Sequence, residues 1–226
     1  MSMTLPDFDN AGHANPATFD SVVGDHMGVL FLELPTRRRL RVNGVLSTEP
    51  HNKVVLSVAE AYPNCPKYIQ RWQPGPDLKK VVSTQIETGN IMTEMITNWI
   101  SSADTFFVTS ALPGGAVDVS HRGGSPGFVV LRGDVLRIPD YPGNSMFGTL
   151  GNFAANPRAG LAFVDFVNNR QLQLTGDVRL DLEGSAKTSD TGGTGRWWEF
   201  TPRQWVISYF NKATDWVLTD RSSFNP

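Results

Sequence analysis

Cysteine and histidine are scarce in this chain of 226 residues. The single cysteine, Cys65, excludes a framework of intrachain disulfides and is typical of a reducing compartment, so we expect a cytoplasmic protein. The four histidines form no H-x-x-x-H pair. Because that is the commonest local spacing of paired histidine ligands, we expect no metal site.

Long apolar runs and a strong net charge are also missing. No stretch approaches the roughly 18 residues that cross a bilayer, and the N-terminal residues lack the basic and apolar regions of a secretory signal. The formal charge of -2 gives no general reason to bind nucleic acid or an anionic membrane. With 40% hydrophobic and 19% charged residues, the composition is that of a globular protein. We therefore expect no nucleic-acid and no membrane partner.

One segment of the chain occurs twice. Gly28–Gly44 aligns without a gap with Gly160–Gly176, and both bounding glycines are kept. Phe31 matches Phe163, and an acidic residue, an arginine and a leucine also match. A repeat of this kind predicts two related β units.

The two copies differ in what precedes them. A polar stretch leads into the first copy, whereas several predicted strands precede the second. We expect a flexible leader over residues 1–23, a partial barrel over 24–76 and a complete barrel over 77–226. A half-barrel with unpaired edges is an aggregation hazard. It must pack on the complete barrel, pair with a second chain, or both, and we expect a homodimer.

Short strands punctuated by Gly and Pro, with few helices, predict a mainly antiparallel β fold with a few helices (α+β) and a barrel, rather than a parallel βαβ fold. Helical spacing of apolar residues predicts a helix within Asn90–Ser102. Further helices are expected over Lys67–Trp72 and Asn144–Ala155, and a mobile loop over Gly184–Gly195. Strands are expected at Val29–Leu34 (a buried one), Arg39–Val42, Val54–Ala61, Thr105–Ala111, Val117–Ser120, Gly127–Leu131, Val135–Ile138, Ala159–Phe166, Leu172–Leu180 and Trp197–Phe210.

Ser120, His121 and Arg122 form the first candidate site. They place a hydroxyl, an imidazole and a guanidinium between two strands, beside glycines that let a ligand approach the backbone. An arginine with hydroxyls and free N–H groups suits a phosphate, because the guanidinium fork matches its oxygens. The alternative is a glycine-rich hairpin turn with a solvated arginine.

The second candidate site is the start of the expected helix at Asn144. If Asn144 or Ser145 caps this helix, its first N–H groups point outward and form an anion site. Thr149 and Asn152 follow within one or two turns. The alternative is a capped amphipathic helix that covers one end of the barrel.

Two other features have ordinary alternatives. Arg37, Arg38, Arg39 and Arg41 could form a phosphate or nucleic-acid patch, but their alternation with apolar residues favours a solvated strand face. Cys65 lies two residues before Lys67 and could be a reactive thiol, although a buried, inert cysteine is commoner.

Taken together, these stretches resemble the pyridoxamine 5'-phosphate oxidase-like family of FMN-binding split barrels, in particular its two-barrel branch. The resemblance is carried by Ala103–Ser110, Ser120–Gly124, Pro139–Asn144, Thr149–Asn152 and Asn156–Phe163, and in the first copy by Arg39–Gly44 and Asn64–Ile69. The family binds FMN where two barrels meet.

The resemblance implies the cofactor site. The cofactor-binding residues that it indicates are Ser120, His121, Arg122, Tyr141, Asn144, Thr149, Asn152 and Lys67. Where the oxidase carries a Lys/Arg-rich pattern, this chain has neutral residues from Asn144 to Thr149, so phosphate binding is expected to rest on Arg122 and neutral donors. No catalytic residue is indicated.

The resemblance also implies a function. It indicates an FMN-dependent oxidoreductase that passes electrons between a small-molecule substrate and FMN, with NADH, NADPH or a small organic donor as reductant. The alternative is a non-catalytic flavin or haem carrier or sensor on the same fold.

Overall fold

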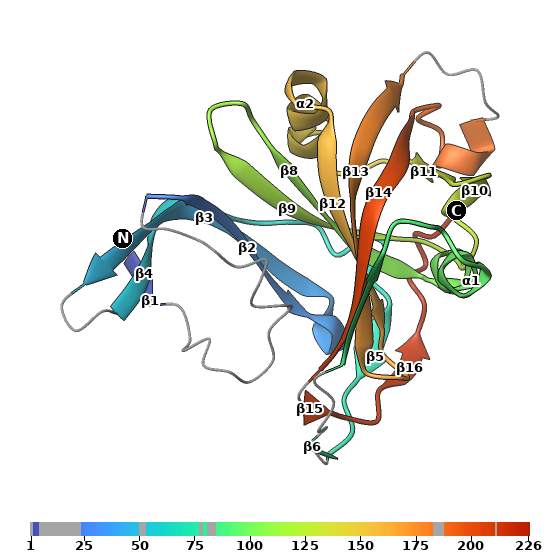
Figure 1. Cartoon of the computed structure of the whole chain (residues 1–226), viewed down its shortest axis with the longest axis horizontal. Coiled ribbons are helices and arrows are strands. Elements are labelled where there is room, and N and C mark those ends of the chain that lie inside the picture. Colours follow the sequence, from blue (N-terminus) through green and yellow to red (C-terminus); the bar gives the residue numbers. More distant parts are fainter. Residues whose placement is uncertain are drawn as a thin grey trace.

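The computed structural model describes residues 2–4, 24–49, 53–76, 79–80, 85–182, 188–210 and 212–226. Its N-terminal part is an antiparallel sheet that extends like an arm from a larger, curled sheet (Figure 1). The arm has the strand order β1–β4–β3–β2. Its strands are β1 (Ser2–Thr4), β2 (His26–Glu33), β3 (Arg38–Glu49) and β4 (Lys53–Pro63), with a short 3-10 helix at Leu34–Thr36 between β2 and β3.

The larger sheet is antiparallel throughout and curls around the main core. Its order is β10–β11–β14–β13–β12–β8–β9, and β7 also pairs with β14. Its strands are β7 (Ile86–Gly89), β8 (Thr105–Ala111), β9 (Val117–Gly123), β10 (Val130–Arg132), β11 (Val135–Pro139), β12 (Arg158–Asp165), β13 (Arg170–Asp181) and β14 (Trp197–Tyr209). Two small pairs complete the described strands: β5 (Arg71–Gln73) with β16 (Val217–Asp220), and β6 (Lys79–Lys80) with β15 (Lys212–Ala213).

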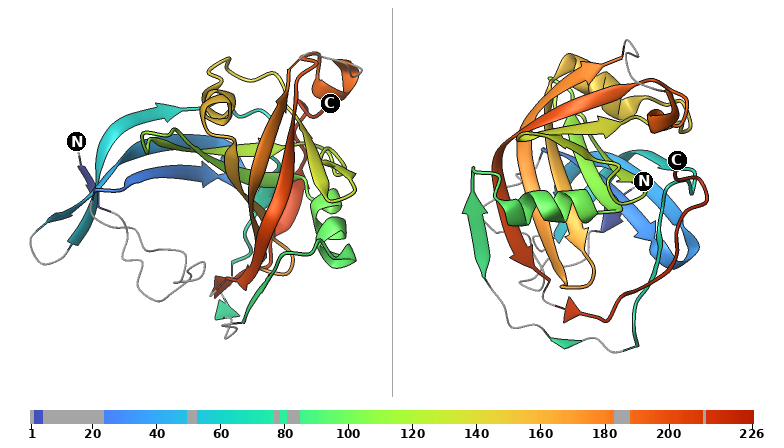
Figure 2. Two further views of the ribbon diagram at one scale, coloured as in Figure 1. Left: turned by 45° about the horizontal axis from the view of Figure 1, so that its top comes forward. Right: turned by 90° about the vertical axis from the view of Figure 1, so that its right-hand side faces the viewer.

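Two α-helices are described, and both contribute to the core of the curled sheet (Figure 2). In α1 (Glu94–Ser102), Ile96 and Ile100 are fully buried one turn apart, and the Thr93 hydroxyl caps the first turn. In α2 (Gly148–Ala155), Phe153 is buried against Trp198. A short 3-10 helix, Thr188–Thr191, precedes β14. The expected fold class, mainly antiparallel β with a few helices, is confirmed.

The repeat is a structural repeat as well as a sequence one. Phe31 pairs with Leu40 across β2 and β3, and Phe163 pairs with Leu172 across β12 and β13, in the same register. A left-handed residue precedes β3 (Arg37, φ 58°) and β13 (Asn169, φ 53°) at matching positions.

The matching glycines explain why both copies bulge at one place. The register of β3 against β4 shifts at Gly44, and that of β13 against β14 shifts at Gly176. A Cβ atom at either glycine would lie 2.2 Å from a carbonyl oxygen of the next strand, so only glycine allows this approach.

The copies differ in what covers them. Phe163 and Leu172 lie in the core with no exposed area, whereas Phe31 is 44% and Leu40 is 39% exposed. The prediction of a buried strand at Val29–Leu34 is therefore wrong for β2, which is half-exposed along most of its length. The second copy lies in the main core with α1 and β8, whereas the first copy is contacted by β9 and keeps part of its apolar face in solvent.

The helix predicted over Lys67–Trp72 does not form. Tyr68 is left-handed (φ 66°), and Arg71 enters β5. The reason is tertiary: the buried amide of Gln70 donates to the carbonyl of Gly124 and accepts from the N–H of Ser222. These distant hydrogen bonds hold the segment extended, against its local preference.

Two other predicted elements begin later in the chain than expected. Helix α2 begins at Gly148 rather than Asn144, because Ser145 and Phe147 are left-handed and cannot continue a helix. β10 begins at Val130, because Gly127 (φ 90°) turns the chain before it. Of the expected leader, residues 1–23, only residues 2–4 are described, and residues 184–187 of the expected mobile loop Gly184–Gly195 lie outside the described residues.

Candidate functional site

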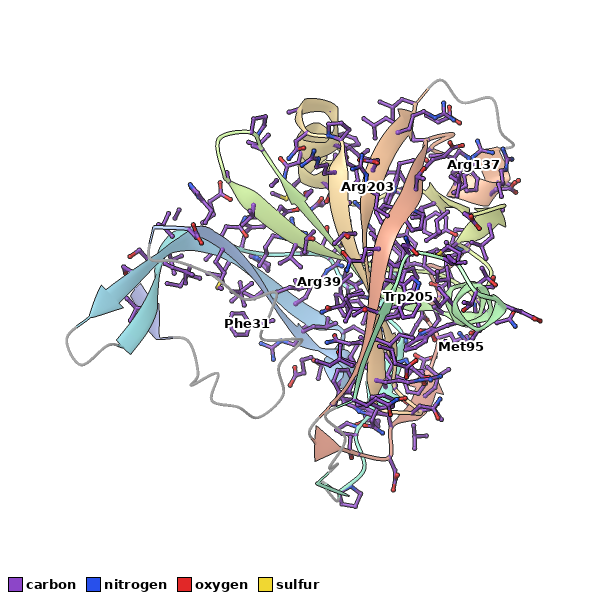
Figure 3. All side chains as sticks on the ribbon, in the orientation of Figure 1. Phe31, Arg39, Met95, Arg137, Arg203 and Trp205 are labelled. Atoms are coloured by element: carbon purple, nitrogen blue, oxygen red, sulfur yellow. The ribbon has the colours of Figure 1, made fainter. Side chains whose placement is uncertain are left out.

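A cavity of about 510 Å³ lies where the arm meets the curled sheet. One wall comes from β3 and the segment 64–68, and the opposite wall comes from β9 and the segments 139–150 and 192–196. Figure 3 labels Arg39 at this junction, and Phe31 farther out on the arm. The site therefore lies between the two unequal repeat units.

Six of the eight predicted cofactor-binding residues line this cavity. They are Ser120, His121, Arg122, Tyr141, Asn144 and Thr149. The other two do not line it. The Asn152 amide donates to the hydroxyl of Ser110 (3.0 Å), and the Lys67 ammonium lies over the ring of Phe224 (5.3 Å).

Asn144 lines the cavity but does not cap α2. Its side-chain oxygen accepts from the N–H of Met146 at 3.2 Å, a local turn that competes with capping. Phe147 occupies the cap position and makes no side-chain cap bond. The first two residues of α2, Gly148 and Thr149, line the cavity, and the cap residue provides no side-chain bond to the first turn.

Three further arginines line the cavity: Arg39 and Arg41, for which the sequence favoured a solvated face over a phosphate patch, and Arg196, which the sequence did not single out. The expectation of a solvated arginine face is wrong for Arg41, which is buried, and for Arg39, which is half-buried; Arg38 points to solvent. The alternation of β3 correctly indicates that Arg39 and Arg41 share a face, but that face meets the curled sheet rather than water. The cavity therefore contains guanidiniums besides that of Arg122. Arg196 lies in a loop, where no sequence pattern marked it.

Two buried aspartates pair with three of the four arginines that line the cavity. Asp118 on β9 lies 2.9 Å from Arg41. Asp140, directly after β11, lies 3.3 Å from Arg122 and 2.9 Å from Arg196. Four arginines against two carboxylates leave the cavity with an excess of positive charge.

His121 is buried and neutral. Burial, and then the positive charges of Arg39 and Arg122, hold its pKa well below the usual value of 6.5. Its Nδ1 lies 3.3 Å from a guanidinium nitrogen of Arg39. Because a guanidinium only donates, Nδ1 must accept and the ring proton must lie on Nε2. His121 therefore orients Arg39 without adding or removing charge.

Hydroxyls connect β9 to the start of α2. Ser120 and Thr149 share a hydrogen bond of 3.0 Å, and the Thr149 hydroxyl also lies 3.3 Å from the Asp118 carboxylate. The Asp118 charge therefore already lies close to the positive end of the α2 dipole.

Aromatic rings form the remaining wall. The rings of Tyr68 and Tyr141 lie 5.1 Å apart, and those of Phe128 and Tyr141 lie 6.4 Å apart. Burial raises the pKa of Tyr68, and raises that of Tyr141 to about 12, so both phenols stay protonated at neutral pH. The Tyr68 hydroxyl donates to the carbonyl of Pro142. Gly123 allows Tyr68 to approach, since a Cβ at that position would lie 2.1 Å from the Tyr68 carbonyl oxygen.

The described residues contain neither a cluster of metal-ligating side chains nor a membrane-spanning helix. No three His, Cys, Asp or Glu side chains gather there as they would to hold a metal ion. No helix in the described ranges is long and apolar enough to span a membrane.

No protein-family model and no curated protein matches the chain. Similar solved structures include a HupZ variant of Group A Streptococcus, with 13% identity, 52% of this chain and 100% of that chain covered, and a TM-score of 0.43. A second similar structure is a protein from Clostridium acetobutylicum that is related to general stress protein 26, of the pyridoxinephosphate oxidase family. It has 13% sequence identity and a TM-score of 0.37, and the match covers 52% of this chain and 89% of that chain. A third is HutZ, named as the heme storage protein of Vibrio cholerae. It has 11% sequence identity and a TM-score of 0.37, and the match covers 51% of this chain and 94% of that chain. Structures of the family that the motifs resemble are thus among those similar to this chain.

Proposed function

We propose that the cavity binds FMN and that this protein is an FMN-dependent oxidoreductase. The excess of positive charge supports this most strongly, because four guanidiniums face only two buried carboxylates. A phosphate monoester carries close to two negative charges at neutral pH, and it is bound well by arginine forks.

The cavity also suits the rest of this cofactor. Its volume of about 510 Å³ is within the usual range of cofactor pockets. The hydroxyls of Ser120 and Thr149 suit a ribityl chain, and the rings of Tyr68, Tyr141 and Phe128 suit a flat heterocycle. When bound, FMN supplies hydride and electron transfer. The protein then has to provide position, polarity and exclusion of water, and the partly enclosed cavity can provide all three.

The first test is whether the purified protein holds a flavin. We expect the visible absorbance of bound oxidised flavin, either as isolated or after adding FMN and removing the excess. Loss of this absorbance on anaerobic addition of NADH, NADPH or a small organic donor, followed by turnover with an acceptor, would support an oxidoreductase. A flavin that binds but is reduced by none of these donors would favour the carrier. A protein that binds no flavin contradicts the proposal, and retention of haem instead would identify a haem carrier.

A further inference from the structure

Among the described residues, no carboxylate pairs with the cavity arginine Arg39. Arg41, Arg122 and Arg196 each lie within 3.3 Å of an aspartate oxygen. Within the described part of the chain, the Arg39 guanidinium contacts only Nδ1 of His121 (3.3 Å) and Sγ of Cys65 (3.7 Å), and its Nε is buried without a partner. The imidazole is neutral, so it does not balance the charge of Arg39.

An unbalanced guanidinium in this position is unfavourable in the free protein. Burial lowers the pKa of Arg39 most; the Cys65 sulfur at 3.7 Å acts in the opposite direction, and the charges of Arg41 and Arg122 lower the pKa further. A buried charge normally requires a partner of opposite sign. The unbalanced charge of Arg39 becomes favourable when an anion enters the cavity.

The repeat shows that the hairpin itself does not require this charge. The position of Arg39 in β3 corresponds to Gln171 in β13, and the two hairpins pair in the same register. The Gln171 amide donates to the Ser208 hydroxyl at 3.1 Å, which an uncharged side chain does well. Arginine at this position of the first copy therefore serves the cavity rather than the strand.

We propose that Arg39, rather than Arg122, binds the anionic group of the ligand in this cavity. Arg122 is engaged by Asp140, and Asp118 already lies near the start of α2. Arg39 is thus the position where a phosphate gains a new ion pair without breaking an existing one. His121 accepts from the guanidinium and positions it. The identity of the anion as the FMN phosphate rests on the proposed function, whereas the role of Arg39 does not.

The test compares FMN with riboflavin, which is the same flavin without the phosphate. The variant is Arg39→Gln, and the matched control is Arg38→Gln, which removes the same charge from the neighbouring residue of β3, whose side chain is 83% exposed. We expect Arg39→Gln to weaken FMN binding by about tenfold to a hundredfold, the usual loss for a charged hydrogen bond, with riboflavin binding changed less than about threefold. Arg38→Gln should change neither affinity appreciably.

A ligand-binding role and a structural role give different results. Equal weakening of FMN and riboflavin by Arg39→Gln would mean that Arg39 only shapes the wall, and this would overturn the proposal. The proposal also fails if Arg122→Gln discriminates between the two flavins and Arg39→Gln does not. Arg39→Lys, which keeps the charge and loses the fork, provides a second variant should Arg39→Gln fold poorly, and it should lose part of the preference for FMN.

A second measurement separates this proposal from the proposed function. If the wild-type protein binds neither flavin, the proposed function fails, and calorimetric titration with inorganic phosphate and pyrophosphate then tests Arg39 directly. Binding that Arg39→Gln or Arg39→Lys weakens and Arg38→Gln retains supports the proposal. No binding to the wild-type protein, or equal binding to all the variants, overturns it.

Discussion

Asp140 is the residue whose loss should disturb the cavity most. Its carboxylate is 8% exposed and accepts from Arg122 at 3.3 Å and from Arg196 at 2.9 Å. Its backbone N–H also donates to the carbonyl of Arg196. The substitution Asp140→Asn keeps the shape of the side chain and removes the charge that both guanidiniums share.

The expected size of the effect follows from the exposure of the partners. Removing one member of a fully buried ion pair costs about 3–5 kcal/mol. The side chains of Arg122 and Arg196 are 22% and 29% exposed, so water screens them once they lose Asp140. We therefore expect a loss of about 2 kcal/mol in the free energy of unfolding. In a chain of this size that corresponds to a fall of about 4–8 °C in Tm.

The matched control is Asp177→Asn. Asp177 pairs with Arg203 at 2.5 Å, but the side chains of Arg203 and Asp177 are 66% and 40% exposed, so the loss should not exceed about 0.5 kcal/mol. Denaturant unfolding of the two variants and the wild-type protein gives the comparison. If Asp140→Asn is as stable as Asp177→Asn, the Asp140 carboxylate does not stabilise the protein by balancing the charges of Arg122 and Arg196.

The same substitution should act in the opposite direction on anion binding. Asp140→Asn increases the excess of positive charge in the cavity, so the affinity for FMN should rise at low ionic strength. The gain should diminish as salt is added, because salt screens the partly exposed guanidiniums. A stability loss together with an affinity loss at every salt concentration would contradict this account of the cavity.

Three further predictions concern the bulge, the arm and the buried imidazole. Gly176→Ala should lower the free energy of unfolding, measured with denaturant, by at least about 2 kcal/mol, because the new Cβ would lie 2.2 Å from a carbonyl oxygen. The control Gly151→Ala, in open space on α2, should raise it by about 0.5–1 kcal/mol, and equal effects of the two substitutions would contradict the close approach at Gly176. We expect a homodimer that covers the first-copy apolar face, so Phe31→Asp should shift the mass measured by light scattering from dimer to monomer, and a monomeric wild-type protein would refute it. Because the pKa of native His121 is held well below 6.5, the unfolded chain takes up a proton there that the native chain does not. Stability should therefore fall by about 1.4 kcal/mol per pH unit below 6.5 from this group, and His121→Gln should flatten that dependence in urea unfolding; an unchanged slope would show that His121 titrates normally.

Local sequence patterns predicted the strands well because strand pairing in a hairpin is decided nearby. β8 was predicted with its observed bounds, and the helix within Asn90–Ser102 forms as α1. The helix over Lys67–Trp72 was wrong because the amide of Gln70 is held by partners far away in the chain. The sequence of the six residues Lys67–Trp72 contains no information on partners that lie so far away in the chain.

The candidate site was predictable in part for the same reason. Ser120, His121 and Arg122 are consecutive in one strand, so a single motif finds them together, and all three line the cavity. Lys67 and Asn152 were predicted because they lie in segments that carry the family resemblance, but their side chains contact other partners. Side-chain direction depends on what packs nearby, which a spacing rule does not contain.

The sequence by itself determined the repeat and its hairpins. Matching glycines allow the bulges, the alternation of β3 and β13 sets which residues share a face, and the turns set the register, and all of these act over a few residues. Only the tertiary structure decided which face of each copy is covered. Phe163 is buried while Phe31 is exposed, and Arg39 faces a cavity while its counterpart Gln171 bonds a neighbouring strand. The physical reason is that alternation defines two faces of a strand, and burial depends on elements from elsewhere in the chain that pack on one of them.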